Sequence, residues 1–483
     1  MRTAKLLTIA WTVACLSASA LAADWPMSAC NPQRTYRTEE DIRAPFELAW
    51  VRYFPDAYVP HRVEPIIAGG TVYISSSKGV YALDAASGQE KWLFATPLPV
   101  GHAPSVAGGL VFVPGLDKHL YAVDAATGRQ KWAFQAGAGF FCNPLIVDGT
   151  VYVGCLDGNV YALSAADGQR KWTFTTGGPV YVSPAFDDGR VYIGSNDMYG
   201  YAIDAATGKQ VWKTDKLPGK SMNSFWPVVA HKAGAVIFVM DNAYRAQHLA
   251  HLDHEVKAKT WPWQGEGGFR GGIYTDAQLR DLERITIEYF QQYPHRQTFL
   301  LIDPATGKQK QFAPVLMVGN AGTRMPPAIG PDGLCYMTIH HDHSSGGLLG
   351  GCHAVSYDIE KNQFVRCYGY HSLGGCNLVG DEPQGLSMAG NMFYGHHLYD
   401  TAGGVDINCP PGDRGVTISS HGGILETWHK THKDVKGQDF CFPFMYQNPH
   451  NTISSMTFSD GRVFIITKQT NALFVFKGQR SGK

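Results

Sequence analysis

The sequence contains the phrase YALSAADGQRKW at residues 161–172, and related phrases occur at three other places in the chain. The other copies are YALDAASGQEKW (81–92), YAVDAATGRQKW (121–132) and YAIDAATGKQVW (201–212). Their closing tryptophans follow one another at intervals of 40 residues. A constant period in this range indicates stacked copies of one supersecondary unit.

The residues around each phrase predict short strands joined by tight turns. The segment GTVYVG (149–154) is apolar, a turn signal follows at 156–158, and a second apolar run begins at Val160. Another turn at Asp167-Gly168 leads into a strand through Trp172, and no helical period is present. A four-stranded antiparallel sheet of this kind cannot bury both faces alone. Copies packed radially around a channel can, so the unit predicts a β-propeller.

The number of blades follows from a glycine that precedes an apolar or aromatic run in the second strand of each unit. Eight glycines fit this pattern: Gly70, Gly109, Gly149, Gly189, Gly234, Gly333, Gly390 and Gly461. The last unit, DGRVFIITKQTNALFVF (460–476), ends before its outer strand. We expect FELAWVRYF (46–54) to supply that strand, because joining the two ends of the ring leaves no open sheet edge. The prediction is an all-β, eight-bladed propeller over residues 46–476, with a lead-in at 23–45 and a tail at 477–483.

The repeat resembles the pyrroloquinoline-quinone-like propeller repeat, and the resemblance rests on GTVYVGCLDGNVYALSAADGQRKW (149–172) and its copies over residues 62–216. The opening DWPMSACNPQRT (24–35) is also similar to the lead-in of secreted members of that group. The family includes quinoprotein dehydrogenases and the propeller lipoprotein of bacterial outer-membrane assembly. The resemblance implies that the repeated tryptophans dock between neighbouring blades and are structural. They are Trp50, Trp92, Trp132, Trp172 and Trp212.

The start of the chain predicts export. Residues 1–5 are basic, residues 6–16 are apolar, and SASALA (17–22) ends in the small-residue pattern of a signal-peptidase site. We therefore expect a signal peptide at 1–22 and a periplasmic or secreted protein. Lipid attachment at Cys15 is a weaker alternative, because Thr12 suits the first position of a lipid-attachment box poorly. No later stretch predicts a transmembrane helix, and the balance of 41 basic and 41 acidic residues gives no reason to expect a nucleic-acid partner.

The fifth unit is interrupted by an insertion of residues 242–296. Within it, TDAQLRDLERITIEYFQQYP (275–294) has the apolar spacing of an amphipathic helix, with Leu279, Leu282, Ile285 and Tyr289 on one face. Such an excursion is typical of a lid or the wall of a cleft, and an ornamental surface loop is the alternative.

One disulfide is predicted from strand register. If Asp148-Gly149 is a two-residue hairpin turn, paired residue numbers sum to 297, and Cys142 then lies opposite Cys155. Export would allow such a bridge to form.

Two groups of side chains are candidate sites. Residues just ahead of the prolines that begin the first strands should surround the channel mouth, where converging polar groups would bind a ligand. These channel-mouth candidates are Glu64, His102, Asn143, Ser183, Trp226 and Arg324. A candidate divalent-metal site comprises His341 and His343 on one side of a strand, with His353 as a third ligand. The alternative for the histidines is an exposed loop, since their spacing matches no recognised metal motif.

Three functions compete. The favoured one is an exported propeller that binds a protein or glycan ligand, or acts as a scaffold, without a cofactor. A carbohydrate lyase, possibly metal-assisted, would instead use histidine and tyrosine for proton transfer and Arg324 or Arg270 against a uronate. A divergent quinoprotein dehydrogenase is the third. Its family resemblance implies quinone and calcium over the channel, with Glu64 and Asn143 as ligands. Ser183 stands where that family has a catalytic Asp, and the chain has no Cys-Cys pair, so pyrroloquinoline quinone is disfavoured.

Overall fold

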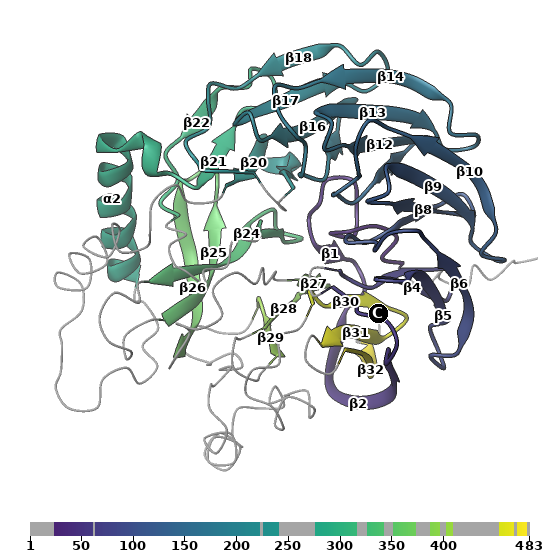
Figure 1. Ribbon diagram of the computed structural model, residues 1–483. Coiled ribbons are helices and arrows are strands. Elements are labelled where there is room, and N and C mark those ends of the chain that lie inside the picture. The colour runs from purple at the N-terminus through teal and green to yellow at the C-terminus, as the bar shows by residue number, and fades with distance from the viewer. Residues whose placement is uncertain are drawn as a thin grey trace, which may run out of the picture.

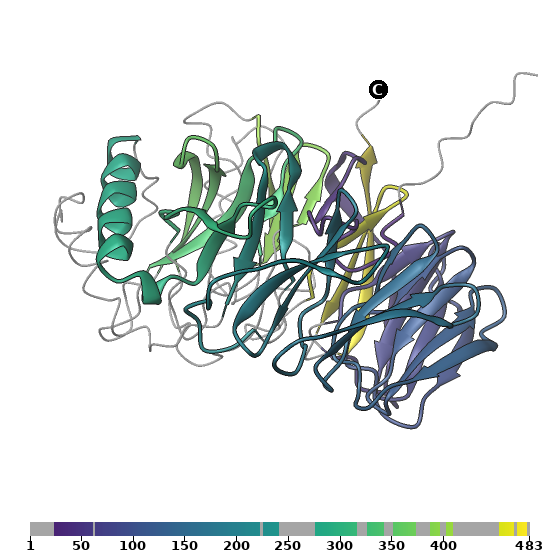
Figure 2. The same ribbon diagram turned by 90° about the horizontal axis from the view of Figure 1, so that it is seen from above.

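The predicted eight-bladed propeller is confirmed (Figures 1 and 2). A computed structural model describes residues 24–60, 63–222, 226–240, 276–315, 326–341, 351–372, 387–396, 402–408, 454–467 and 471–480. Eight sheets of four strands surround one axis. The first strand of the repeat lies nearest the axis in every blade except the seventh, where β1 pairs with the inner edge of that strand. Within the described residues, no helix is both long and apolar enough to cross a bilayer.

The first four blades follow the 40-residue repeat. Blade 1 contains β3 (Ile66–Ala68), β4 (Thr71–Ser76), β5 (Gly79–Asp84) and β6 (Glu90–Ala95). Blade 2 contains β7 (Ser105–Ala107), β8 (Leu110–Pro114), β9 (His119–Asp124) and β10 (Gln130–Gln135). Blade 3 contains β11 (Leu145–Val147), β12 (Thr150–Gly154), β13 (Asn159–Ser164) and β14 (Arg170–Thr175). Blade 4 contains β15 (Ala185–Asp187), β16 (Arg190–Ser195), β17 (Tyr199–Asp204) and β18 (Gln210–Lys213).

The next three blades depart from the repeat. Blade 5 contains β19 (Val228–Ala230), β20 (Ala235–Val239), β21 (Phe299–Ile302) and β22 (Gln309–Gln311), with short helices η1 (His231–Ala233) and η3 (Pro294–Arg296). Blade 6 contains β23 (Ala328–Ile329), β24 (Cys335–His341), β25 (Gly351–Asp358) and β26 (Gln363–Ser372). Blade 7 contains β27 (Ser387–Ala389), β28 (Met392–His396) and β29 (Ala402–Asp406), and β1 (Arg37–Thr38) is its fourth strand.

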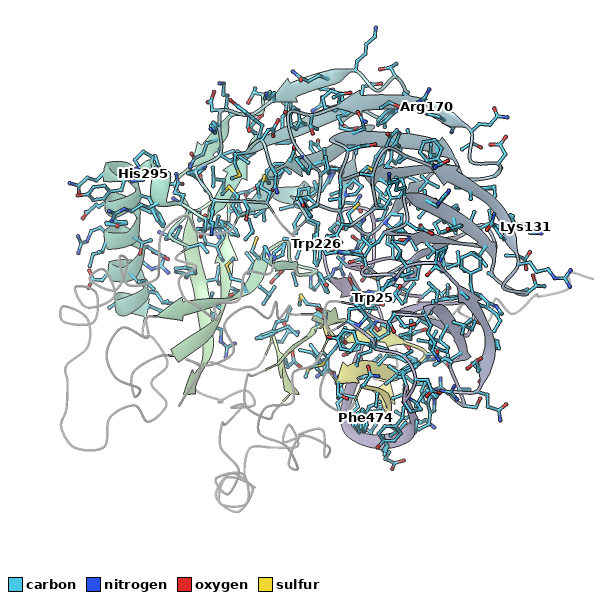
Figure 3. The ribbon with its side chains drawn as sticks, in the orientation of Figure 1. Trp25, Lys131, Arg170, Trp226, His295 and Phe474 are labelled. Carbon is cyan, nitrogen blue, oxygen red and sulfur yellow. The ribbon has the colours of Figure 1, made fainter. Side chains whose placement is uncertain are left out.

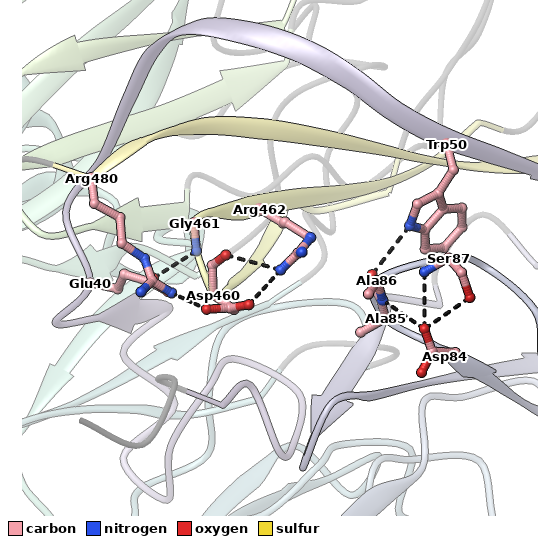
Figure 4. A network of polar contacts seen from close by, with 10 residues as sticks. All are labelled: Glu40, Trp50, Asp84, Ala85, Ala86, Ser87, Asp460, Gly461, Arg462 and Arg480. Carbon is pink, nitrogen blue, oxygen red and sulfur yellow. Dashed lines mark hydrogen bonds and ion pairs between the residues drawn. The ribbon is translucent and has the colours of Figure 1, made fainter. Parts of the chain in front are cut away.

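The eighth blade joins the two ends of the chain, as predicted. It contains β30 (Thr457–Ser459), β31 (Arg462–Thr467), β32 (Ala472–Arg480) and β2 (Ile42–Tyr53), and β2 pairs antiparallel with β32. Beside this closure, Glu40 accepts a hydrogen bond from Gly461 N at 2.7 Å and pairs with Arg480 Nε at 2.7 Å (Figure 4). Asp460 pairs with Arg480 and also with Arg462, so a charged network holds the two ends of the chain together.

The repeated tryptophans lie at the contacts between consecutive blades. Trp50 Nε1 donates to Ala85 O at 3.2 Å, and the equivalent bonds from the other four are 2.8–3.0 Å long (Figure 4). Each indole packs on a glycine of the next blade that has positive φ, such as Gly128 beneath Trp92. A Cβ at Gly128 would lie 2.8 Å from Trp92 Cγ. A residue without a side chain is therefore needed there both for its conformation and for the close approach of the ring.

A second contact between blades uses the aspartate of a turn. Asp157 accepts the Tyr161 hydroxyl at 2.6 Å within blade 3 and Gly137 N of blade 2 at 3.0 Å. Burial opposes ionisation of Asp157, but these hydrogen bonds outweigh it and lower its pKa. Burial together with the carboxylate raises the pKa of Tyr161 to about 12. Asp197 makes the same two contacts with Tyr201 and Gly177, so the tie recurs one blade later.

The predicted helix is present as α2 (Asp276–Gln292), and its expected apolar face is buried. Leu279 and Leu282 are fully covered. Polar contacts also fix the helix, because Arg280 donates to Phe364 O and Glu283 accepts from Phe364 N on β26. The helix thus lies against β26 on the outside of blade 6 (Figure 1).

The predicted blades were all antiparallel, and the structure corrects this at blade 7. There β1 runs parallel to β27, with Arg37 opposite Met388. The reason is that β1 does not come from the repeat at all. It belongs to the segment that precedes the propeller in the sequence, which occupies the channel.

Candidate functional site: the channel and its mouth

Residues 24–38, here called the axial segment, pass through the channel and pair with the innermost strands. Trp25 and Ile67 exchange two backbone hydrogen bonds of 2.9 Å. Further carbonyls of the segment accept N–H groups at 2.7–2.9 Å from five other innermost strands, those of Val106, Phe186, Val229, Ile329 and Met388. The innermost strand of a blade has one unpaired edge, and the axial segment satisfies donors on those edges. The axial segment thereby lies along the inner wall of the channel.

Glu64 is the polar centre of this arrangement. Its carboxylate accepts hydrogen bonds from Trp25 Nε1 at 3.1 Å, the Ser28 hydroxyl, Ala29 N at 3.2 Å and the Tyr36 hydroxyl at 3.2 Å. Only 4% of its surface is exposed. Burial raises the pKa of Glu64, although the hydrogen bonds from the axial segment act in the opposite direction.

Arg34 supplies the opposite charge from within the axial segment and is fully buried. Its guanidinium donates to Pro184 O at 2.9 Å, Ser28 O at 2.6 Å and Asn143 O at 3.4 Å. Burial lowers its pKa to about 10 against the attraction of the Glu64 carboxylate. A buried cation is tolerated only when it is hydrogen-bonded and charge-compensated, and Arg34 meets both conditions.

The structure brings five of the six channel-mouth candidates to the channel and buries all five. Asn143 N donates to Ser183 Oγ at 2.8 Å, and the Trp226 ring lies 5.4 Å from that of Tyr36. Figure 3 shows Trp226 and Trp25 near the centre of the ring of blades. Arg324 lies outside the described residues, as does the Arg270 considered for a lyase. The five residues lie at the channel as expected, and their role in ligand binding stays a prediction. The sequence did not indicate the axial segment that lies against them.

A row of rings borders the mouth. The His102 and Phe141 rings are 4.4 Å apart with an interplanar angle of 75°, and Phe141 and Tyr181 are 5.8 Å apart at 80°. We call His102, Phe141 and Tyr181 the aromatic row. Phe141 and Tyr181 occupy the same position in successive repeats and are half-buried. Such edge-to-face packing is a favourable arrangement of aromatic rings and holds the row together.

The Trp226 indole adds a polar group to this mouth. Trp226 is 6% exposed, and its Nε1 donates to no acceptor among the described residues. A buried donor without a partner costs free energy, so such groups are rare in folded proteins and often mark a place where a ligand or water binds.

The residues at the axis do not fit a calcium-bound quinone. Calcium takes about six to eight oxygen ligands, and the carboxylate that the resemblance assigns to it is already bonded to four donors of the axial segment. Arg34 places a second, permanent cation beside that carboxylate.

The candidate metal site is placed only in part. His341 ends β24 opposite Gly351, and His353 lies on β25 opposite Ile339, so the two residues belong to adjacent strands. His343 is outside the described residues. In the part of the chain that is described, no three His, Cys, Asp or Glu side chains are grouped as metal ligands. The metal site stays a prediction.

The predicted disulfide is wrong in this structure, where Cys142 and Cys155 are separate buried thiols. The register itself follows the expected sum, since Leu145 pairs with Tyr152. However, β11 begins only at Leu145, so Cys142 lies before the ladder and is not held opposite Cys155. Cys142 Sγ instead contacts Gly154 O at 3.3 Å, and Cys155 Sγ contacts Ala138 O at 3.2 Å. Burial raises the pKa of both thiols to about 12.

The sequence and the structure were compared with known proteins. The family described as outer membrane protein assembly factor BamB matches residues 47–145 and 135–254. No curated protein sequence gave a significant match. Quinohemoprotein alcohol dehydrogenase ADHIIG from Pseudomonas putida HK5 superposes with a TM-score of 0.57 and 15% identity, over 95% of this chain and 81% of that one.

Two further solved structures share the fold. The quinohemoprotein alcohol dehydrogenase from Comamonas testosteroni gives a TM-score of 0.56 and 14% identity, over 95% of this chain and 82% of that one. A europium-containing methanol dehydrogenase gives 0.54 and 15%, over 80% of this chain and 84% of that one. At this identity the likeness concerns the fold alone. The chain is thus an eight-bladed β-propeller, and its repeats over residues 47–254, which match that family, are of the pyrroloquinoline-quinone-like type.

Proposed function

We propose that this protein is an extracytoplasmic propeller that binds another protein and acts as a scaffold for it. We further propose that this propeller holds no cofactor at its axis. The observation that carries the proposal is the axial segment. It occupies the channel and engages Glu64, the group that the resemblance assigns to calcium. Because the axial segment holds the blades together at the axis, we expect a partner to bind at the surface of the propeller instead. The signal-peptide pattern of residues 1–22 supports a location outside the cytoplasm.

The mouth is the surface that suits a partner best. The half-buried Phe141 and Tyr181 of the aromatic row lie at the mouth together with the Trp226 donor, which has no partner among the described residues. Aromatic anchors of this kind dominate the binding energy of protein interfaces. The matching family is described as an assembly factor, which supports a scaffold role.

A photo-crosslinking residue tests the binding surface. We would place it at Tyr181 in the aromatic row and, as a control, at Lys131 on the outer strand β10, and illuminate cells that produce the protein. We expect one defined adduct from position 181 that position 131 does not form, and its loss on Phe141→Ala. Equal adducts from the two positions would count against the mouth.

A cofactor assay tests the absence of quinone chemistry at the axis. Purified protein would be incubated with pyrroloquinoline quinone and calcium, dialysed, and examined by absorbance and thermal unfolding. We expect no retained quinone band and no change in Tm. A retained band with a raised Tm would show that the axial segment yields to the quinone, and the proposal would be wrong.

A further inference from the structure

A pocket of about 410 Å³ opens at the outer seam between blades 4 and 5, away from the channel. The outer strands β6, β10 and β14 of the first three blades each contain six residues, whereas β18 has four and β22 has three. The shortening leaves space between the two outer strands. The repeat thus fails at a particular place and creates a concavity there.

The local sequence explains why β18 ends early. Thr214 still pairs with Gly200. The backbone N–H of Thr214 donates to Gly200 O at 2.9 Å, and the Thr214 hydroxyl oxygen accepts a hydrogen bond from Gly200 N at 3.0 Å. The chain then turns inward, and Leu217 N donates to Met198 O at 2.7 Å. Pro218 follows and cannot donate a ladder hydrogen bond, so the strand does not resume.

The pocket has an apolar floor and a polar rim. Leu217, Leu300 and Ile302 line it and are each at least 96% buried. The rim carries Asp215, Lys216 and Gln309, all exposed. An apolar floor of this volume with a few polar groups at its edge is the usual form of a site for a small ligand or an anchoring side chain.

The rim charges set the character of the ligand. Asp215 pairs with Lys308 of the blade 5 turn at 3.0 Å, so its charge is compensated. Lys216 forms no ion pair with any residue in the described ranges. Within the described ranges, the rim therefore presents Lys216 as a cation without an ion pair, beside the exposed ring of His295 and above an apolar floor. This arrangement complements an apolar side chain flanked by a carboxylate.

We propose that this seam pocket binds an extended acidic peptide, with a leucine-like side chain on the floor and a carboxylate beside Lys216. The proposal rests on the proposed function only in that the protein binds other proteins. It concerns a different surface, so the two can fail separately.

Saturation-transfer difference NMR tests the pocket, with the probe acetyl-Ser-Glu-Leu-Glu-Ser-amide. We expect the leucine methyl groups to receive the strongest saturation from the parent protein. The variant Gln309→Trp covers the rim and should abolish that signal. Its matched control is Gln210→Trp, because Gln210 holds the same repeat position in blade 4. A parent protein that leaves the probe unsaturated would overturn the proposal, as would equal signals from the two tryptophan variants.

A charge variant tests the acidic part of the ligand. Lys216→Glu should reduce the saturation about two- to fivefold at low salt, the range of an exposed ion pair, whereas Lys209→Glu should not. Equal loss in both variants, or none in either, would refute a role for Lys216. The variant Tyr181→Ala should leave the saturation-transfer signal unchanged, since it alters only the mouth. Loss of the signal in this variant would show that the peptide binds at the mouth and would refute the seam pocket.

Discussion

Single residues decide what the axis of this propeller does. Glu64 and Arg34 carry opposite charges and are both buried at the channel. Glu64 accepts hydrogen bonds from the axial segment, and Arg34 donates to backbone carbonyls of the channel wall and of the axial segment. Removing one member of such a pair leaves the other as an uncompensated buried charge. Losing either residue should therefore lower the free energy of unfolding, because the remaining charge would stay buried without compensation.

The variant Arg34→Met tests this pair. It removes the cation beside Glu64 and four hydrogen bonds to backbone carbonyls, and we expect a loss of about 3–5 kcal/mol in the free energy of unfolding. Urea unfolding measures it. Arg129→Met is the control, because that arginine is exposed in a turn. A loss below about 1 kcal/mol, ordinary for any substitution, would contradict the role given to Arg34.

His231 gives the protein a small pH dependence. Its Nδ1 lies 2.6 Å from Asp187 Oδ2, and this hydrogen bond raises the pKa of His231 above its usual 6.5. A raised pKa means that the stabilisation is complete below 6.5 and is lost as the pH rises through the folded value. Because His231 is exposed, the effect should be at most about 1 kcal/mol. Unfolding of the parent and of His231→Gln at low and high pH measures it, and an equal pH slope in the two proteins would contradict it.

At the scale of elements, the blades stay in register because an indole and a glycine meet at each seam. The outer strand of one blade carries a tryptophan near its start, and the turn of the next blade offers it a backbone carbonyl and a glycine without a side chain. The contact thus depends on two elements that the sequence repeats together.

Gly128→Ala tests that seam against a matched glycine. Gly128 has φ +71° with Trp92 against it, and Gly109 has φ +75° with open space around it. Both substitutions strain the backbone, but only Gly128→Ala also pushes the Trp92 ring from its place. We expect Gly128→Ala to be less stable than Gly109→Ala by about 1–3 kcal/mol, the usual cost of overpacking. Thermal or urea unfolding of both proteins gives the difference, and equal losses would disprove the role of the ring contact.

Elements that repeat could be predicted from the sequence, and elements that occur once could not. The glycine ahead of each second strand located the eight blades, because a turn with positive φ strongly favours that residue. The Cys142 prediction failed since register says nothing of where a strand begins. Nothing in the lead-in has a period, so its path through the channel was hidden, although Trp25, Arg34 and Tyr36 are large side chains that usually need partners.

At the scale of the whole molecule, the ring is held at its axis and at its edge by the same stretch of sequence. The axial segment bridges the innermost strands, and β2 follows directly and completes blade 8. Two separate weaknesses of a propeller, its unpaired inner edges and its open end, are therefore removed by one continuous piece of chain.

Deletion of residues 24–38 tests the axial role. The innermost strands would lose their backbone partners and Glu64 would lose its donors, so we expect little folded protein and a much lower Tm in whatever is recovered. Removing residues 481–483 is the control. Hydrogen exchange of the full protein provides a second measurement, in which the amides of Val106, Phe186 and Val229 should exchange slowly. Rapid exchange there would show that the segment does not hold those strands.

The pairing of β2 with β32 has a consequence for how the protein is made. Ile42 and Arg480 are neighbours in space, yet more than four hundred residues separate them, so blade 8 cannot close until β32 has been synthesised. An emerging polypeptide can build its early sheets but cannot lock them into a circle. A product truncated before β32 would leave β2 without its partner strand. Its unpaired strand edges would be open to proteolysis and would favour aggregation.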